Sequence, residues 1–476
     1  MKSRSTLVNA TRQHDSHTLN GAVTHSTSLS ACLDMFFMAG ATRNWDEERI
    51  IHLFLMAYAE NRTLAYQILF WARDCRGGAG EKRFFRTIAI YCSKNMPEEW
   101  EALSIITPEY GYWKDIFSIE EPNENNLNWL SIQLEENENA NLLAKYFPRK
   151  GKWFVAMHKY KKMDPKSFRK YLVQMSNTVE QEICAGKWEA IDYAKVPSVA
   201  MNTYRNAFMK HDEARFTAFN QSVLDGNTKV NASVLFPHQL YQAMLQGQDE
   251  TAVEAQWQAL PNYMEGSSER ILPVCDVSGS MMGLPMDVSI GLGLYIAERN
   301  EGIFQNAFLT FSENPTMEFV QGSTLKQKFN SIARADWGGS TNLQATFQLI
   351  LNRAIKHSLP ESEMPTKLLI ISDMEFNECE GYWRSSTNLE AVQDQYAKAG
   401  YKMPQIIFWN VNARLGNVPA EMDQINVGLV SGFSPSILKS ILHGVVETPH
   451  QLMMNTIKSD RYKPVTNVLS LVEYSL

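Results

Sequence analysis

The stretch Ile271-Leu-Pro-Val-Cys-Asp-Val-Ser-Gly-Ser280 is a short apolar run that ends in an acid and two hydroxyls. The apolar run has the length of a buried strand, and residues 286–299 that follow have the pattern of a helix. Similar apolar runs at 307–311, 367–372, 405–411 and 425–430 alternate with further helical segments. Strands that alternate with helices predict a mostly parallel sheet covered on both faces. We therefore expect residues 266–476 to form a doubly wound α/β domain.

The chain before residue 266 has a different pattern. Helical segments follow one another from about residue 30 to residue 264, with little strand signal. Asn44 is placed to cap a helix with Asp46, Glu47 and Glu48 in its first turn, and Asn61 is placed to cap the next. Helix pairs joined by short breaks predict a HEAT-like helical-repeat array over residues 29–265, after an N-terminal extension of residues 1–28. The expected fold class is α + α/β.

Composition and charge limit the classes of protein that this chain can be. Its 476 residues are 44% apolar and 20% charged, which indicates a folded protein of two or three domains. The net charge of −7 excludes a uniformly basic surface but allows a local basic patch. The six cysteines include no C-x-x-C pair, and no apolar run approaches the roughly 18 residues of a membrane span. The N-terminal residues lack the core of a secretory signal, so we expect a reduced, cytoplasmic protein with no membrane partner.

The acid and hydroxyls of the opening stretch predict a metal site. Asp276, Ser278 and Ser280 follow a strand directly, and ligands gather beyond the carboxyl ends of the strands in such sheets. The loop that carries Thr341 and the strand that ends in Asp373 can bring both residues to the same edge. Carboxylate and hydroxyl oxygens suit Mg²⁺, with Mn²⁺ and Ca²⁺ as alternatives. The alternative role for Asp276 is a turn or helix-capping acid.

The order of these residues on an α/β pattern resembles the metal-ion-dependent adhesion site of von Willebrand factor A-type domains. The resemblance implies that Ser278 and Ser280 bind the metal directly and that Thr341 is a direct or conformation-dependent ligand. It implies that Asp276 and Asp373 act directly or through water, with Glu375 as a neighbour. One coordination position would remain for a partner's acidic group.

The helical half is similar to the corresponding region of the Ro autoantigen (TROVE) ribonucleoprotein family, and more similar to a second family with the same two-part arrangement. The residues that carry the second resemblance are Asn20-Gly-Ala-Val-Thr-His-Ser26, Arg73-Asp-Cys-Arg-Gly-Gly78, Pro108-Glu-Tyr-Gly-Tyr-Trp-Lys-Asp115, Pro148-Arg-Lys-Gly-Lys152 and Val196-Pro-Ser198. The Ro resemblance implies a ring of helical repeats that binds single-stranded RNA ends in its hole and structured RNA outside.

A basic segment is the candidate RNA contact. Residues 145–170 hold ten Lys or Arg against one acid, with aromatic residues interleaved. Lysine and arginine neutralise phosphates while aromatic faces stack on bases. The candidates are Arg149, Lys150, Lys152, Trp153, Lys159, Lys161 and Lys162. The alternatives are a solvated helix face, a buried Trp153, and pairing of the lysines with the acidic segment 98–138.

A glycine-rich turn at residues 76–83 fails the pattern of a phosphate loop and is expected to join two helices, with Arg73, Arg76, Lys82 and Arg83 as secondary basic candidates. No nucleophile elbow or H-E-x-x-H is present, and Cys275 is expected in the core. We expect a non-catalytic RNA-binding protein whose Mg²⁺-bearing domain binds an acidic protein partner. The alternatives are a metal-dependent interaction module without RNA and a Mg²⁺-dependent enzyme that acts on nucleic acid.

Overall fold

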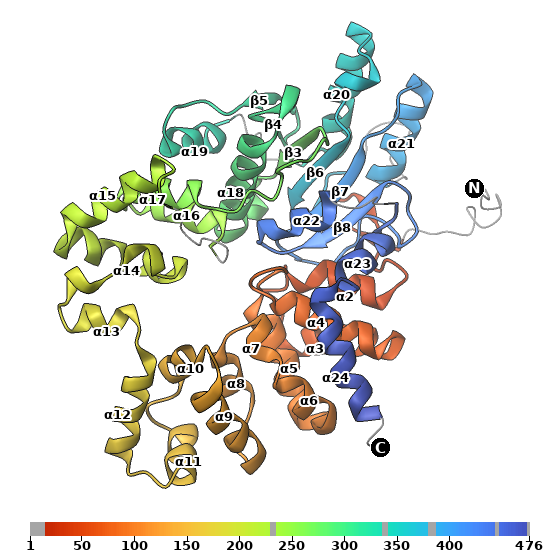
Figure 1. Cartoon of the computed structure of the whole chain (residues 1–476). Helices are drawn as coiled ribbons and strands as arrows, with labels where there is room; N and C mark the ends of the chain where they lie inside the picture. The colour runs from red at the N-terminus through yellow and green to blue at the C-terminus, as the bar shows by residue number, and fades with distance from the viewer. Residues whose placement is uncertain (1–14, 229–234, 336–340, 379–386, 443–446, 474–476) are drawn as a thin grey trace.

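The computed structural model describes residues 15–228, 235–335, 341–378, 387–442 and 447–473. It confirms a helical N-terminal region followed by an α/β region (Figure 1). The sheet has six strands in the order β5-β4-β3-β6-β7-β8, and all neighbours are parallel except β4 and β5. The strands are β3 (Ile271–Cys275), β4 (Ala307–Thr310), β5 (Met317–Phe319), β6 (Lys367–Ser372), β7 (Gln405–Asn410) and β8 (Val427–Ser431).

Burial explains the apolar runs of the sequence. Every residue of β3, β6 and β8 is buried, as expected for parallel strands with both faces covered. The helix α18 packs on β3, β4 and β6, and α2 and α23 pack on β8. The helices of this region are α18 (Leu284–Arg299), α19 (Leu325–Ala333), α20 (Leu343–His357), α21 (Asn388–Ala399), α22 (Leu438–Leu442), α23 (Pro449–Ile457) and α24 (Lys463–Glu473).

In the described part of the N-terminal region, a hairpin of β1 (Ser16–His17) and β2 (Val23–Thr24) comes first and is followed by helices. These are α2 (Ala31–Ala39), α3 (Glu47–Glu60), α4 (Arg62–Arg73), α5 (Lys82–Asn95), α6 (Pro97–Ser104), α7 (Thr107–Tyr110), α8 (Trp113–Ile119), α9 (Glu124–Glu136), α10 (Ala140–Tyr146), α11 (Lys152–Tyr160), α12 (Pro165–Ser176), α13 (Val179–Cys184), α14 (Ser198–His211), α15 (Glu213–Leu224), α16 (Pro237–Leu245) and α17 (Glu250–Gln258). Asn61 caps α4 as predicted, but the cap of α3 is Asp46 instead of Asn44, because α3 begins three residues after Asn44.

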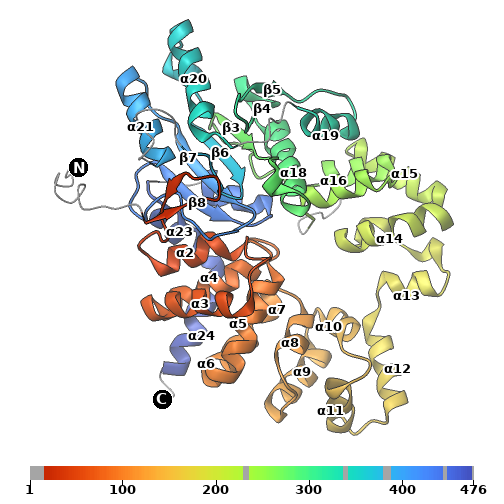
Figure 2. The ribbon, with the colours of Figure 1, turned by 180° about the vertical axis from the view of Figure 1, so that it is seen from behind.

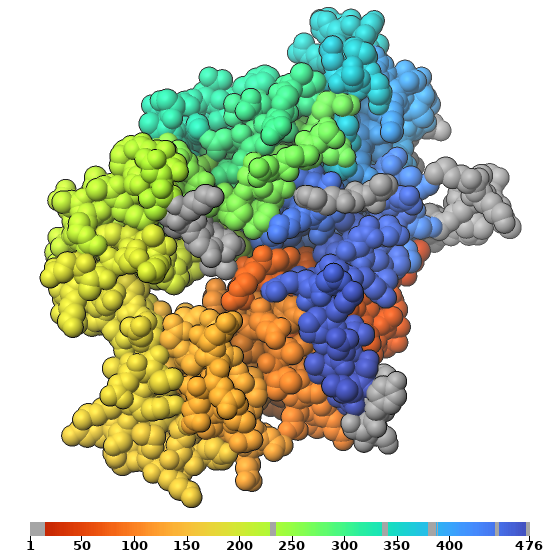
Figure 3. Space-filling view, viewed as in Figure 1, coloured from red at the N-terminus to blue at the C-terminus, as the bar shows by residue number. Residues whose placement is uncertain are grey.

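The helical path curves back onto the sheet. In Figures 1 and 2, α8 to α12 lead away from the α/β region and α14 to α17 return to it. The return is made by α16, which packs on α18, while α2 holds the start of the path against β8. The space-filling view shows an opening between α10 and α14 (Figure 3). An ion pair joins α10 to α13, with 2.6 Å between Nζ of Lys145 and Oε1 of Glu180.

The described residues form three hydrophobic cores. The largest includes residues from Ala22 to Leu469 and joins the first helices to the sheet. A second lies within residues 113–172 and a third within residues 191–252. The last helix before the sheet, α17, ends at Gln258, and the first strand of the sheet, β3, begins at Ile271. The largest core includes residues from both sides of this change. The first helices are therefore part of the same packed body as the sheet.

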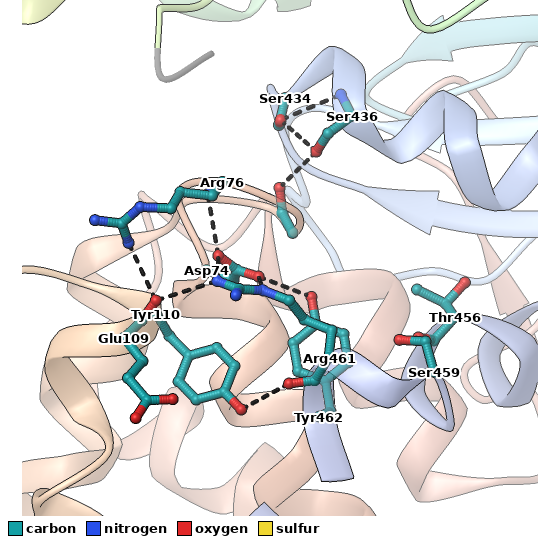
Figure 4. A network of polar contacts seen from close by, with 11 residues as sticks. Asp74, Arg76, Glu109, Tyr110, Ser434, Ser436, Thr456, Ser459, Arg461 and Tyr462 are labelled. Atoms are coloured by element: carbon teal, nitrogen blue, oxygen red, sulfur yellow. Dashed lines mark hydrogen bonds and ion pairs between the residues drawn. The ribbon is translucent and has the colours of Figure 1, made fainter. Parts of the chain in front are cut away.

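Residues 73–78 and 108–115 both contact the C-terminal segment around the buried side chain of Asp74 (Figure 4). Asp74 is fully buried and accepts two hydrogen bonds from Arg461, of 2.7 Å from Nε and 2.9 Å from Nη2. The hydroxyl of Tyr110 donates to the carbonyl of Arg461 at 2.8 Å. Gly78 is required here because a Cβ would lie 2.0 Å from the carbonyl oxygen of Trp71. These stretches therefore fasten the C-terminal segment to the helical region.

Candidate metal site

Asp276 and Asp373 follow β3 and β6, which are neighbouring parallel strands. The backbone N–H of Asp276 donates to the carbonyl of Ile371 at 3.0 Å, so the ladder between the strands continues to the first acid. The two carboxylates therefore lie at the same edge of the sheet, as the sequence predicted from the strand ends.

The carboxylate of Asp276 is fully buried. Its Oδ1 accepts from the backbone N–H of Ser278 at 2.9 Å, and its Oδ2 accepts from the hydroxyl of Ser372 at 2.6 Å. The first contact closes a local turn, which is the alternative role considered for this acid. A turn alone does not require complete burial, and the hydroxyls of Ser278 and Ser280 lie 3.0 Å apart on the same turn. The residues that resemble metal ligands are thus gathered in one place.

Asp373 has an oxygen without a partner. Its Oδ1 accepts from the backbone N–H of Glu375 at 3.2 Å, whereas its Oδ2 is buried and finds no hydrogen-bond partner among the described residues. The next residue, Met374, has a φ of 66°, which is uncommon for a residue with a side chain. Backbone strain of this kind gathers at binding sites, and here it lies at the residue directly after the candidate ligand Asp373.

The two acids disfavour each other's charge. Burial raises the pKa of Asp276, and the neighbouring charge of Asp373 raises it further. Burial also raises the pKa of Asp373, which the nearby hydroxyl of Ser280 and the charge of Arg414 partly offset. A bound divalent cation would stabilise both carboxylates as anions and give Oδ2 of Asp373 a partner. The residues present therefore fit a hard cation.

The donor set is poor in carboxylates. In the part of the chain that the structure describes, no group of three His, Cys, Asp or Glu side chains is gathered as a metal cluster. Two carboxylates with several hydroxyls suit Mg²⁺ better than Ca²⁺ or a transition metal, because Mg²⁺ keeps water ligands and uses one or two carboxylates.

Thr341 lies at the same edge, but its hydroxyl is turned toward the segment after Asp373. It donates to the carbonyl of Glu375 at 2.7 Å and accepts from Nδ2 of Asn20 at 3.2 Å. The adjoining loop 336–340, expected to help place Thr341, lies outside the described residues. Asn342 caps α20 by accepting from Ala345 N–H at 2.9 Å, which fixes the backbone beside Thr341.

Glu375 is buried, and backbone donors occupy its carboxylate. Its Oε2 accepts from Leu19 N–H at 2.6 Å, and its Oε1 accepts from Leu415 N–H at 3.5 Å. Glu375 is therefore a neighbour of the candidate ligands, as expected. The hairpin contact was not predicted, although Asn20-Gly21 is a typical hairpin turn and was a usable signal.

The basic candidates are only partly available. Arg149 donates to the carbonyls of Ala144 and Phe147, at 2.9 and 3.3 Å. Lys152 pairs with Glu121, and Lys161 pairs with Glu135 at 2.6 Å. Both acids belong to the acidic segment, as the pairing alternative expected. Lys150, Lys159 and Lys162 are exposed and lie at the ends of α11 or beside it.

Trp153 is only 2% exposed and lies in the second core, with Phe117 edge-on at 5.4 Å between ring centroids. The expectation that it stacks on RNA bases is therefore corrected, because its ring is enclosed by the core of α8 to α12. Among the secondary candidates, Arg73 is fully buried against Asp115, with 2.7 Å between Nη2 and Oδ2. Arg83 donates to the carbonyls of Thr42 and Arg43. Arg76 donates to the carbonyl of Glu109, and Lys82 is exposed.

The fold and this geometry define a class of protein, in which a helical array is joined to an α/β sheet with an oxygen-lined candidate cation site at its carboxyl edge. The family model described as domain of unknown function (DUF2828) matches residues 18–121 and 131–269, and the model described as domain of unknown function (DUF7788) matches residues 270–470. The chain is 30% identical to uncharacterized protein L728 of Acanthamoeba polyphaga mimivirus, over 94% of this chain and 88% of that protein. The chain belongs to the DUF2828 family. Within the described residues, no helix is both long and apolar enough to cross a membrane.

Proposed function

We propose that this chain is a non-catalytic binding protein that holds its partner through a divalent cation, as the resemblance to von Willebrand factor A-type domains implies. The observation that carries the proposal is the buried pair Asp276 and Asp373, with the hydroxyls of Ser278 and Ser280 beside it. Oδ2 of Asp373 has no hydrogen-bond partner among the described residues. Buried charges are normally paired or bound to metal.

Mg²⁺ would be held by these four side chains, with Thr341 as a conformation-dependent fifth. The cation would supply a positive charge with an open coordination position, which suits a carboxylate from an acidic partner. The rim of the site fits a protein partner. Arg414 and the apolar side chains of Met282 and Leu415 are exposed there, and Met282 is 79% exposed. Apolar residues around a charged centre are typical of protein interfaces.

RNA binding is the second candidate function. It is favoured by the exposed lysines at α11 and α12, which are Lys150, Lys159, Lys162, Lys166 and Lys170. Exposed lysines contribute phosphate contacts without base specificity. The Ro resemblance adds the expectation of a helical ring, and the curved path with its opening is compatible with it (Figure 3). The burial of Trp153 and the pairing of Lys152 and Lys161 place this candidate second.

Calorimetric titration of Mg²⁺ into the purified chain tests the first proposal, with Mn²⁺ titration followed by electron paramagnetic resonance as a second readout. We expect one bound cation in the natural chain and none in Asp276→Asn, which keeps the shape of the side chain. Asp460→Asn is the matched control, because the Asp460 side chain is 90% exposed. Failure of the natural chain to bind either cation, or equal binding by Asp276→Asn, would overturn the proposal.

A further inference from the structure

The N-terminal hairpin lies against the candidate cation site. In Figure 2 its red ribbon lies beside the strands of the sheet, although the hairpin begins the described chain and the strands are near its end. The turn is made by Thr18 to Gly21, where Gly21 N–H donates to the carbonyl of Thr18 at 3.1 Å. Gly21 has a φ of 87°, which this turn requires and which glycine adopts without strain.

The turn of the hairpin binds the segment that follows Asp373. The hydroxyl of Thr18 donates to the carbonyl of Phe376 at 2.6 Å, and Leu19 N–H donates to Oε2 of Glu375 at 2.6 Å. Gly21 also pairs with Asn377 as an isolated antiparallel bridge. The backbone after Asp373 is thus held from outside by a segment more than 350 residues away in the chain.

Asn20 is the residue that connects the hairpin to Thr341. Its side-chain amide has two N–H donors, and both are used. One donates to the carbonyl of Glu375 at 2.6 Å and the other to the hydroxyl of Thr341 at 3.2 Å. The hydroxyl of Thr341 in turn donates its proton toward the carbonyl of Glu375 at 2.7 Å, and Oδ1 of Asn377 lies 3.2 Å from the same hydroxyl. With its proton given and one lone pair occupied by Asn20, the hydroxyl has one lone pair left.

We infer that Asn20 is a positioning residue of the cation site, and that docking of the N-terminal hairpin and binding of the cation stabilise each other. This inference rests on the proposed function. Asn20 touches neither Asp276 nor Asp373 in the hydrogen bonds of the described chain, so it acts through Thr341 and through the backbone at Glu375. Coupling between two sites is reciprocal, so a hairpin that improves cation binding must itself be held more firmly when the cation is bound.

The test compares the natural chain with Asn20→Ala and Asn20→Leu in Mg²⁺ titration calorimetry. Ala removes both donors, and Leu keeps the approximate shape of the side chain without donors or an added charge. We expect Mg²⁺ binding to weaken by about three- to tenfold in both variants, the range that loss of a hydrogen bond of this kind produces. Leu19→Ala is the control, because the Leu19 side chain is 54% exposed and this residue reaches Glu375 through its backbone.

Hydrogen–deuterium exchange supplies a readout that a purely structural role would not move. In the natural chain, Mg²⁺ should slow exchange of the backbone amides of residues 16–24, and in Asn20→Ala this protection should be smaller. If Asp276→Asn abolishes Mg²⁺ binding while Asn20→Ala binds as tightly as the natural chain, or more tightly, the inference about the hairpin is wrong and the cation site stands. If the natural chain binds no Mg²⁺, both are wrong. Exchange at residues 16–24 that does not respond to Mg²⁺ also overturns the coupling.

Discussion

Asp373→Asn should have opposite effects on stability without and with a divalent cation. Asp373 is 2% exposed beside the fully buried Asp276. Burial raises the pKa of both carboxyl groups, and the charge of Asp373 raises the pKa of Asp276 further. An asparagine keeps the shape of the side chain and removes one charge. Without a cation the variant should therefore be more stable than the natural chain, because the unfavourable pair is gone.

The magnitude follows from Oδ2 of Asp373, which is buried without a hydrogen-bond partner among the described residues. A buried unsatisfied polar group costs about 1–3 kcal/mol, and an amide at this position can donate to a neighbouring oxygen. We expect the free energy of unfolding in EDTA to rise by about 1–2 kcal/mol. A cation that binds only the folded chain contributes about 2.7 kcal/mol when present at a hundred times its Kd. The variant should lose this contribution and become the less stable chain in Mg²⁺.

Urea unfolding followed by tryptophan fluorescence, in EDTA and in excess Mg²⁺, measures both differences. Asp460→Asn serves again as the control for loss of a surface carboxylate and should change neither. An equal loss of stability in EDTA and in Mg²⁺ would refute the reasoning. Asp373 would then be an ordinary turn acid whose contact with Glu375 N–H is its whole role.

The remaining predictions concern the basic face and a buried histidine. Replacing Lys150, Lys159 and Lys162 together with Glu should weaken binding of a single-stranded RNA by at least about tenfold and reduce its salt slope by about two, because exposed lysines release counterions from phosphates. Fluorescence anisotropy at several salt concentrations measures both, and an unchanged affinity would show that the face is only solvated. Burial lowers the pKa of His238 to about 3. The unfolded chain, with a histidine pKa near 6.5, binds a proton that the folded chain does not, so stability should fall as the pH falls below about 6.5. The loss at pH 5 is about 2 kcal/mol, and His238→Gln should flatten it in urea unfolding between pH 5 and 8. A variant with the natural pH dependence would contradict this assignment.

The acids of the candidate site could be predicted because their signal is local. Asp276 and Asp373 each follow a buried apolar run directly, and parallel neighbouring strands bring such positions together. The direction of the Thr341 hydroxyl could not be predicted in this way. It depends on Asn20, which is 321 residues away in the chain. A hairpin turn is visible in the sequence, but the surface that it meets is decided by tertiary packing.

The basic segment was also only partly predictable from the sequence, because the pairing of its lysines depends on tertiary packing. Its charge was plain in the sequence, but charge does not tell which lysines are paired. Lys152 and Lys161 meet Glu121 and Glu135 only because α11 packs against α9 and the loop that precedes it. The aromatic residues were ambiguous because tryptophan serves both cores and RNA surfaces, and here Trp153 belongs to the core.

The loop after β7 is where the helical region and the candidate cation site are joined. Ala413 N–H donates to the carbonyl of Ala41 at 3.0 Å, and the indole N–H of Trp45 donates to the carbonyl of Ala413. Arg414 of the same loop lowers the pKa of Asp373 by its charge. The loop is therefore held by the start of the helical region on one side and faces the acids on the other. Because Ala413 is tied to Ala41 and Trp45 by direct hydrogen bonds, the loop cannot move away from the helical region without breaking them.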